Sequence, residues 1–205
     1  MSHAVPIVFV VDDDVSVRES LELLIRNAGW QPETFESAQD FLSRPRPPVP
    51  SCLLLDIALP GLNGLELQKR IAADRADMPI IFITGVGDVP KTVQAMKAGA
   101  VEFLMKPFSD TVLLDAIQQA IERSEAALGV ETEINSLQER YATLSLRERQ
   151  VMALVVSGLL NKQVGFELGI TEITVKTHRG RVMRKMDARS LAELVNIAGR
   201  LGIVR

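Results

Sequence analysis

The stretch IVFVVDDDVSVRESL, residues 7–21, decides the fold. Its apolar run leads directly into Asp12, Asp13 and Asp14, and the residues that follow have the pattern of an amphipathic helix. Adjacent carboxylates repel one another, and the end of a buried strand raises the cost of each charge. Two interpretations account for the three carboxylates: a solvated turn in which Asp14 caps the next helix, or a site for a hard cation.

Apolar runs of the same kind recur along the first half of the chain. They lie at residues 52–55, 80–83 and 101–104, with a weaker strand pattern at residues 31–35. Helical patterns separate them, at residues 15–28, 38–42, 65–73 and 90–98 and from residue 111 onward. Uninterrupted apolar runs are typical of parallel strands covered on both faces. The alternation predicts an α/β fold, a doubly wound five-stranded parallel sheet.

Polar residues follow the predicted strands at their carboxyl ends. Asp56 follows the run at 52–55, Thr84 follows the run at 80–83, and Lys106 comes just after the run at 101–104. The carboxyl ends of parallel strands share one edge of a sheet, where α/β proteins form their sites. We therefore expect these side chains to converge with Asp12 and Asp13 in a functional site.

The composition is that of a soluble globular protein, with 47% hydrophobic and 24% charged residues. The apolar runs are too short to span a membrane and no leader pattern opens the sequence, so we expect a cytoplasmic protein without a membrane partner. Cys52 is the only cysteine, which excludes an internal disulfide. His3 and His178 are far apart, and no cysteine or histidine spacing indicates zinc.

The net charge of −3 hides an asymmetry between the two halves. Residues 1–142 carry 12 basic and 21 acidic side chains, a charge of −9, whereas residues 143–205 carry 11 and 5, a charge of +6. An acidic half with clustered carboxylates suits a metal ion, and a small basic domain suits a polyanion such as nucleic acid.

The basic half has an all-helical pattern. Its helices correspond to LSLRERQVMALVVSGLL with Ser145 as N-cap, NKQVGFELG, ITEITVKTHRGRVMRKM and RSLAELVNIAGRLG. The short joint at residues 169–171, which begins with a glycine, is typical of helix-turn-helix units. One face of the third helix carries Val175, His178, Val182 and Met186. We therefore interpret His178 as a packed core residue and not as a ligand.

Residues 124–142 form a predicted helical linker between a domain at residues 1–123 and a domain at residues 143–205. A heptad-like seam runs along this segment and consists of Val130, Ile134, Leu137 and Tyr141. The preceding helix is expected to continue outward through the segment, although Gly129 weakens it and a break there is an alternative. A short surface helix folded onto one of the domains is the other interpretation.

With these residues placed, the chain resembles a two-component response regulator. The first half resembles a receiver domain with a flavodoxin-like fold, because the acidic pair, Asp56, Thr84 and Lys106 agree at separated positions. The second half resembles the helix-turn-helix output domain of the LuxR/NarL type, on the motifs LSLRERQV, NKQVGFELGITEITVKTH and VMRKM. The segment ITGVGDVPKTVQAMKAGAVEFLMKPF, residues 83–108, resembles the FixJ branch of that family.

The resemblance implies a role for each matching residue of the first half. Asp56 is the implied phosphoacceptor, Thr84 the hydroxyl that meets a phosphoryl oxygen, Lys106 its cationic partner in a cis peptide with Pro107, and Phe103 the aromatic switch. Mg²⁺ is the implied cofactor, held by Asp12, Asp13, Asp56 and the backbone carbonyl of Ala58. Magnesium binds few carboxylates plus water and phosphate oxygens, and such cations stabilise a phosphoryl group in transfer.

The resemblance also implies a sensor histidine kinase as phosphodonor, promoter DNA as target and RNA polymerase as a further partner. Base contacts are expected from Lys176 and Thr177, and phosphate contacts from Lys162, Arg179, Arg184 and Lys185. Phosphorylation is expected to cause dimerisation through residues 90–104, with Val89, Val93, Lys97 and Val101 as surface positions. A constitutive dimer through the seam at residues 130–141 is the rival arrangement.

Certain residues depart from what such a regulator would carry. Ala58 and Val86 have no side chain able to orient a hydrolytic water, so slow loss of the phosphoryl group is expected. Gly180 stands in the third helix of the second half where a side chain is usual, so no side-chain contact with a base is expected at that position.

Two other functions compete with transcription regulation. An aspartate-nucleophile phosphatase needs an acid two residues after the nucleophile, where this sequence has Ala58. A protein-binding adaptor is disfavoured by the charge of +6 and by the outward-facing basic residues of the third helix in the second half.

Overall fold

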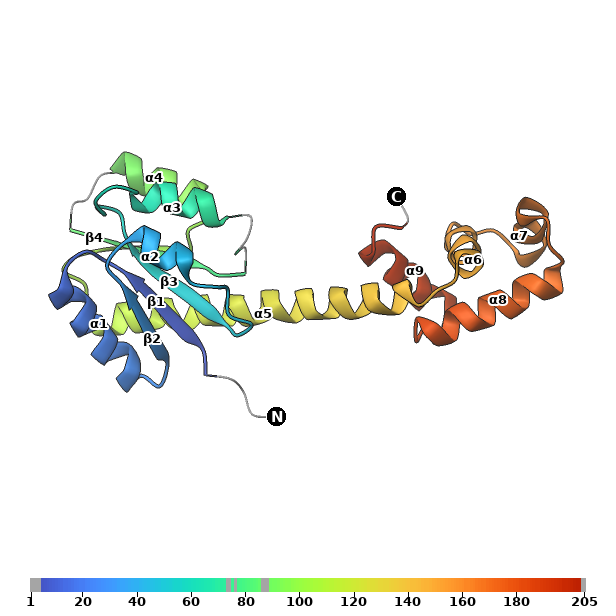
Figure 1. Ribbon diagram of the computed structural model, residues 1–205, viewed down its shortest axis with the longest axis horizontal. Helices are drawn as coiled ribbons and strands as arrows, with labels where there is room; N and C mark the ends of the chain where they lie inside the picture. Colours follow the sequence, from blue (N-terminus) through green and yellow to red (C-terminus); the bar gives the residue numbers. More distant parts are fainter. Residues whose placement is uncertain (1–4, 73–74, 76, 86–88, 204–205) are drawn as a thin grey trace. The chain divides into compact units, whose positions relative to one another are not determined.

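The computed structural model describes residues 5–72, 75, 77–85 and 89–203. The chain divides into two compact units, Met1–Gly129 and Val130–Arg205 (Figure 1). The division falls inside the predicted linker at residues 124–142, so that the larger part of that segment, residues 130–142, belongs to the C-terminal unit.

The first unit contains a five-stranded parallel sheet in the order β2-β1-β3-β4-β5, which confirms the predicted doubly wound fold. Its strands are β1 (Ile7–Val11), β2 (Gln31–Phe35), β3 (Ser51–Asp56), β4 (Ile80–Thr84) and β5 (Glu102–Met105). All residues of β1, β3 and β4 are buried because these strands lie in the middle of the sheet with helices over both faces. That position explains their uninterrupted apolar sequence.

Helices cover the sheet on both faces (Figure 1). They are α1 (Val15–Asn27), α2 (Ala38–Ser43), α3 (Gly64–Ile71), α4 (Val89–Lys97) and the first part of α5 (Asp110–Ala142). One apolar cluster joins Phe9 of β1 to α2, α3 and α4, and a second joins Val8 and Val10 to α1 and α5. Alternate side chains of β1 thus serve opposite layers, as the period of a strand requires.

Helix α5 continues without a break through Gly129, which confirms that the helix extends into the predicted linker. Its first turns pack on the sheet through Leu113 and Ile117. Its last turns belong to the second unit, because Leu137 is buried there and Tyr141 packs against the same cluster. Half of the seam predicted at residues 130–141 is therefore used within the chain.

The second unit is all-helical, as predicted. Besides the end of α5 it contains α6 (Leu146–Val156), α7 (Asn161–Leu168), α8 (Glu172–Lys185) and α9 (Leu191–Arg200). Ser145 caps α6 by accepting a hydrogen bond from the Glu148 backbone, and the Glu148 carboxylate accepts one from the Ser145 backbone. Gly169 ends α7 with φ of 64°, a left-handed conformation that favours glycine.

A close approach of backbone segments at Gly64 generates a stability prediction. A Cβ atom on Gly64 would lie 2.5 Å from the Asp56 carbonyl oxygen, whereas one on Gly129 would meet nothing within 4 Å. We expect Gly64→Ala to destabilise the first unit by about 1–3 kcal/mol, because backbone atoms have to move apart. Gly129→Ala, in the interior of α5, is the control. It should stabilise this helix by up to about 1 kcal/mol.

Urea denaturation followed by tryptophan fluorescence checks this prediction, since Trp30 is the only tryptophan and packs in the first unit. Equal midpoints for Gly64→Ala and the unmodified protein would contradict it.

Candidate functional site

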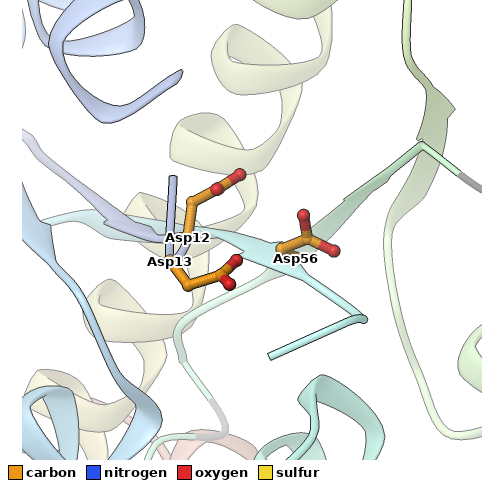
Figure 2. A group of neighbouring side chains, drawn as sticks. All are labelled: Asp12, Asp13 and Asp56. Atoms are coloured by element: carbon orange, nitrogen blue, oxygen red, sulfur yellow. The ribbon is translucent and has the colours of Figure 1, made fainter. Parts of the chain in front are cut away.

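The carboxylates of Asp12, Asp13 and Asp56 gather where β1 and β3 end (Figure 2). Each offers a ligand oxygen, and these oxygens all lie within 4.8 Å of one another. Asp12 is fully buried and Asp56 is 6% exposed, whereas Asp13 is exposed to solvent. The convergence follows from the parallel pairing of β1 with β3, which brings their carboxyl ends to one edge of the sheet.

Lys106 provides the positive charge that compensates this cluster. Its Nζ atom donates to Asp12 Oδ2 at 2.7 Å and to Asp56 Oδ2 at 3.1 Å. Burial lowers the pKa of Lys106, but the hydrogen bonds to Asp12 and Asp56 outweigh it and leave the pKa raised. Burial also raises the pKa of Asp12, and the hydrogen bond from Lys106 opposes that rise only in part. The Lys106–Pro107 peptide is cis, as expected.

The turn after β1 fixes the direction of its carboxylates. Asp14 accepts a hydrogen bond from the Ser16 backbone at 2.8 Å and is the N-cap of α1, so the capping interpretation of this residue is confirmed. Asp12 Oδ1 accepts a bond from the Asp14 backbone at 3.0 Å. Asp14 therefore caps the helix, whereas Asp12 and Asp13 belong to the carboxylate cluster.

The remaining predicted residues of the first unit lie around the same edge. Asp56 Oδ1 accepts a hydrogen bond at 2.8 Å from the backbone of Ala58. Thr84 is buried and follows Ile83, which is the direct strand partner of Asp56. Phe103 is half-buried and packs against the cluster beneath α2, α3 and α4. Val86 lies outside the described residues.

Two residues near the carboxylates were not predicted from the sequence. The guanidinium of Arg18 donates to the Asp12 carbonyl oxygen at 2.7 Å and so ties α1 to the end of β1. Gly64 lets α3 approach the Asp56 backbone. An arginine one turn into a helix and a glycine at a helix start are common, so neither carries a signal in the sequence alone.

The donor set fits a hard divalent cation. Carboxylate oxygens are the ligands that Mg²⁺ prefers, and the exposure of Asp13 leaves room for bound water, which this ion retains. No other group of this kind occurs among the residues that the structure describes.

Of the side chains predicted to contact DNA, some are exposed to solvent and others are bonded within the second unit. Lys162, Lys176, Thr177 and Arg184 are exposed. Arg179 is half-buried and donates to Asn161 Oδ1 at 3.1 Å, which joins α8 to the start of α7. The opposite face of α8 contains buried Val175 and Val182, with Met186 at its C-cap, as predicted. His178 is half-buried on that side.

Lys185 has a partner that the sequence did not indicate. Its Nζ atom donates to Glu148 Oε2 at 2.6 Å and to the Thr143 carbonyl at 2.9 Å. Glu148 is buried, and the hydrogen bond from Lys185 lowers its pKa. The ion pair is a competing use of the ammonium that was predicted to contact phosphate.

Comparisons with known proteins agree with both halves of the chain. Residues 8–118 match the response regulator receiver domain, and residues 142–198 match the bacterial regulatory proteins of the luxR family. The chain is 52% identical over 197 residues to nodulation protein W of Bradyrhizobium diazoefficiens, covering 96% of this chain and 87% of that relative. It is 43% identical over 197 residues to the transcriptional regulatory protein FixJ of the same organism, covering 96% of each chain.

A solved structure of the response regulator StyR matches with a TM-score of 0.84 and 48% identity, covering 96% of this chain and all of that one.

The chain therefore belongs to the two-component response regulators with a receiver domain and a luxR-type DNA-binding domain. Within them it belongs to the FixJ type. FixJ and StyR are regulators by name, which supports the expectation of a regulator over a phosphatase. Among the described residues, no helix has the length and apolar character needed to cross a bilayer.

The carboxylate cluster generates a metal-binding prediction. Asp13→Asn should weaken Mg²⁺ binding at least about ten-fold, because it removes a negative ligand oxygen. Asp14→Asn is the matched control and should leave the affinity unchanged, since Asp14 caps α1 and asparagine caps equally well. Isothermal titration calorimetry with MgCl₂ measures both. Equal losses in the two variants would mean that general charge, and not ligation by Asp13, attracts the cation.

Proposed function

We propose that Asp56 accepts a phosphoryl group from a sensor histidine kinase and that this reaction makes the protein dimerise and bind promoter DNA. The observation that carries the proposal is the contact of Lys106 with both Asp12 and Asp56 beside the exposed Asp13. The family supports the same chemistry, since the first half is a receiver domain.

The nucleophile is an Asp56 carboxylate oxygen that is already oriented. The Ala58 backbone N–H holds one oxygen and the Lys106 ammonium contacts the other. The carboxylate forms a new P–O bond as the P–N bond of the kinase phosphohistidine breaks, which yields an acyl phosphate. Lys106 offsets the negative charge that accumulates at this edge of the sheet.

Mg²⁺ would be held by Asp12, Asp13, Asp56 and the Ala58 carbonyl, and it supplies positive charge opposite the phosphoryl oxygens. Ala58 brings no polar side chain near Asp56, so the proposal includes slow hydrolysis of the acyl phosphate.

The proposed signal passes from Asp56 to α4 and β5. Thr84 ends the strand beside Asp56 and supplies a hydroxyl for a phosphoryl oxygen, and Phe103 lies half-buried on the neighbouring strand. Repacking of this aromatic residue changes the outer face of α4, where Val93 and Met96 are exposed. Lys97 is also exposed there, and Val101 is half-buried.

This route is favoured over a constitutive dimer through the seam at residues 130–141. Leu137 is buried inside its own unit and Tyr141 packs there too. The apolar surface left along the seam is that of exposed Val130 and half-buried Ile134.

In a helix-turn-helix the second helix enters the major groove with its N-terminal residues at the base edges. For this chain that helix is α8, with Lys176 and Thr177 proposed for base contacts and Lys162, Arg179 and Arg184 for phosphates. Lys185 stays a proposed phosphate contact that competes with its bond to Glu148. RNA polymerase is the proposed further partner at the promoter.

The phosphorylation step generates a direct prediction. Acetyl phosphate with Mg²⁺ should add one phosphoryl group by intact mass and raise the molar mass toward a dimer in light scattering. Asp56→Asn should abolish both changes, because an amide cannot form the acyl phosphate. Asp115→Asn, a change of an exposed aspartate in α5, is the control and should retain both. Retention of the label by Asp56→Asn would overturn the assignment.

The DNA contacts generate a second prediction. Lys176→Ala should weaken the preferred site by about 1–3 kcal/mol and relax its sequence preference, because it removes a base contact. Arg184→Ala should instead weaken all duplexes alike and lower the slope of log affinity against log salt by about one unit. Fluorescence anisotropy over a salt series measures both. An equal loss of affinity for preferred and random duplexes in Lys176→Ala would contradict a base contact. If the unmodified protein bound duplexes with an affinity that did not depend on salt, a protein-binding adaptor would be favoured.

A further inference from the structure

The exposed face of α8 combines polar residues, an apolar residue and a glycine, which has no side chain. The exposed residues of this helix are Glu172, Ile173, Lys176, Thr177, Gly180, Arg181 and Arg184. Ile173, Thr177, Gly180 and Arg184 follow one another at helical spacing and so share one side. Buried Val175 and Val182 hold the other side against the unit.

Ile173 is the large apolar residue of this face, with 77% of its surface exposed in the first turn of α8. Single exposed apolar residues are common and carry no meaning alone. The position of Ile173 carries the argument, because the first turn of this helix is the part of a helix-turn-helix that reaches the base edges. It lies three and four residues from Lys176 and Thr177, the proposed base contacts.

The polar groups around Ile173 already have partners within the helix. Lys176 Nζ lies 3.1 Å from Glu172 Oε1. The Thr177 hydroxyl donates to the Ile173 carbonyl at 3.1 Å, which leaves its oxygen to accept a hydrogen bond from a base. Ile173 belongs to none of the apolar clusters found in the described chain. A ligand that meets this turn therefore finds an apolar surface flanked by hydrogen-bonding groups that are partly satisfied.

Gly180 lies seven residues after Ile173, two turns along the same side, and a Cβ atom there would meet nothing within 4 Å. Because glycine has no side chain, the middle of this face is flat, which lets the backbone of α8 come close to a DNA groove. The unit also has the charge that a DNA ligand requires, since residues 143–205 carry 11 basic and 5 acidic side chains.

We propose that Ile173 reads the C5-methyl group of thymine in the major groove, so that the preferred site carries an A·T pair opposite the first turn of α8. The inference rests on the DNA-binding function proposed above and names one of the base pairs that it recognises. Thymine is the base that offers an apolar group in the major groove, and apolar side chains recognise it there.

The experiment removes only the methyl group. Full-length protein treated with acetyl phosphate and Mg²⁺ first selects its best duplex from a random pool. Each dT of that duplex is then replaced singly by dU, which keeps the hydrogen-bonding edges, and affinity is measured by fluorescence anisotropy at fixed salt. One dU position per half-site should weaken binding about three- to five-fold, the effect of losing one buried methyl group.

Ile173→Ala should bind the dT and dU duplexes equally at that position, because its contact with the methyl group is gone. Leu146→Ala is the matched control, since Leu146 is 76% exposed at the start of α6 in the same unit. It should retain the full penalty for dU. Both side chains are exposed, so neither change removes a core contact.

An undiminished dU penalty in Ile173→Ala would overturn the inference, as would a selected site whose dT positions all tolerate dU. Either result leaves sequence-specific DNA binding intact. A protein that selects no duplex from the pool would overturn the DNA-binding function itself, and this inference with it.

Discussion

The contact of Lys106 with Asp12 and Asp56 is the interaction on which the first unit depends. Lys106 comes directly after edge strand β5, and its ammonium reaches the carboxylates of Asp12, which follows β1, and Asp56, which ends β3; both strands lie beyond β4 in the sheet. Two buried carboxylates without this cation would destabilise the fold, since an uncompensated buried charge costs several kcal/mol. Other features lie at the same edge of the sheet: the cis peptide before Pro107, the hydrogen bond of Arg18 to the Asp12 carbonyl, and the close packing of Gly64 on the Asp56 backbone.

Contacts between charged or polar side chains also join the elements of the second unit. The Glu148 carboxylate accepts a hydrogen bond from the backbone of Ser145, the N-cap of α6, and one from Lys185 at the end of α8, so one buried carboxylate joins two helices. Arg179 joins α8 to α7 through Asn161. These bonds fix the inner side of α8, while its outer side presents Ile173, Lys176, Gly180 and Arg184 to solvent. A rigid inner side is what allows a helix to present a defined outer face to a groove.

Sequence patterns predicted the elements well where local periodicity decides structure. The buried strands, the helices of the second unit and the capping role of Asp14 were expected from such patterns, and the cis peptide before Pro107 was expected from the resemblance to response regulators. Sequence patterns predicted less where the structure depends on contacts between residues far apart in the chain. Nothing near Lys185 in the sequence points to Glu148, which is 37 residues away. Leu137 and Tyr141 had the spacing of an intermolecular seam, yet both contact their own unit.

The sequence by itself determined the fold class, the two-part organisation and the residue types of both sites, because apolar runs, turn residues and charges act over a few neighbouring positions. Only the tertiary structure decided which charges meet. Lys106 contacts Asp12 across 94 residues because the parallel order β2-β1-β3-β4-β5 brings the strand ends to one edge. Likewise, packing of α8 on its neighbours decided that Lys185 turns inward while Ile173 remains exposed, since burial depends on what lies opposite a side chain.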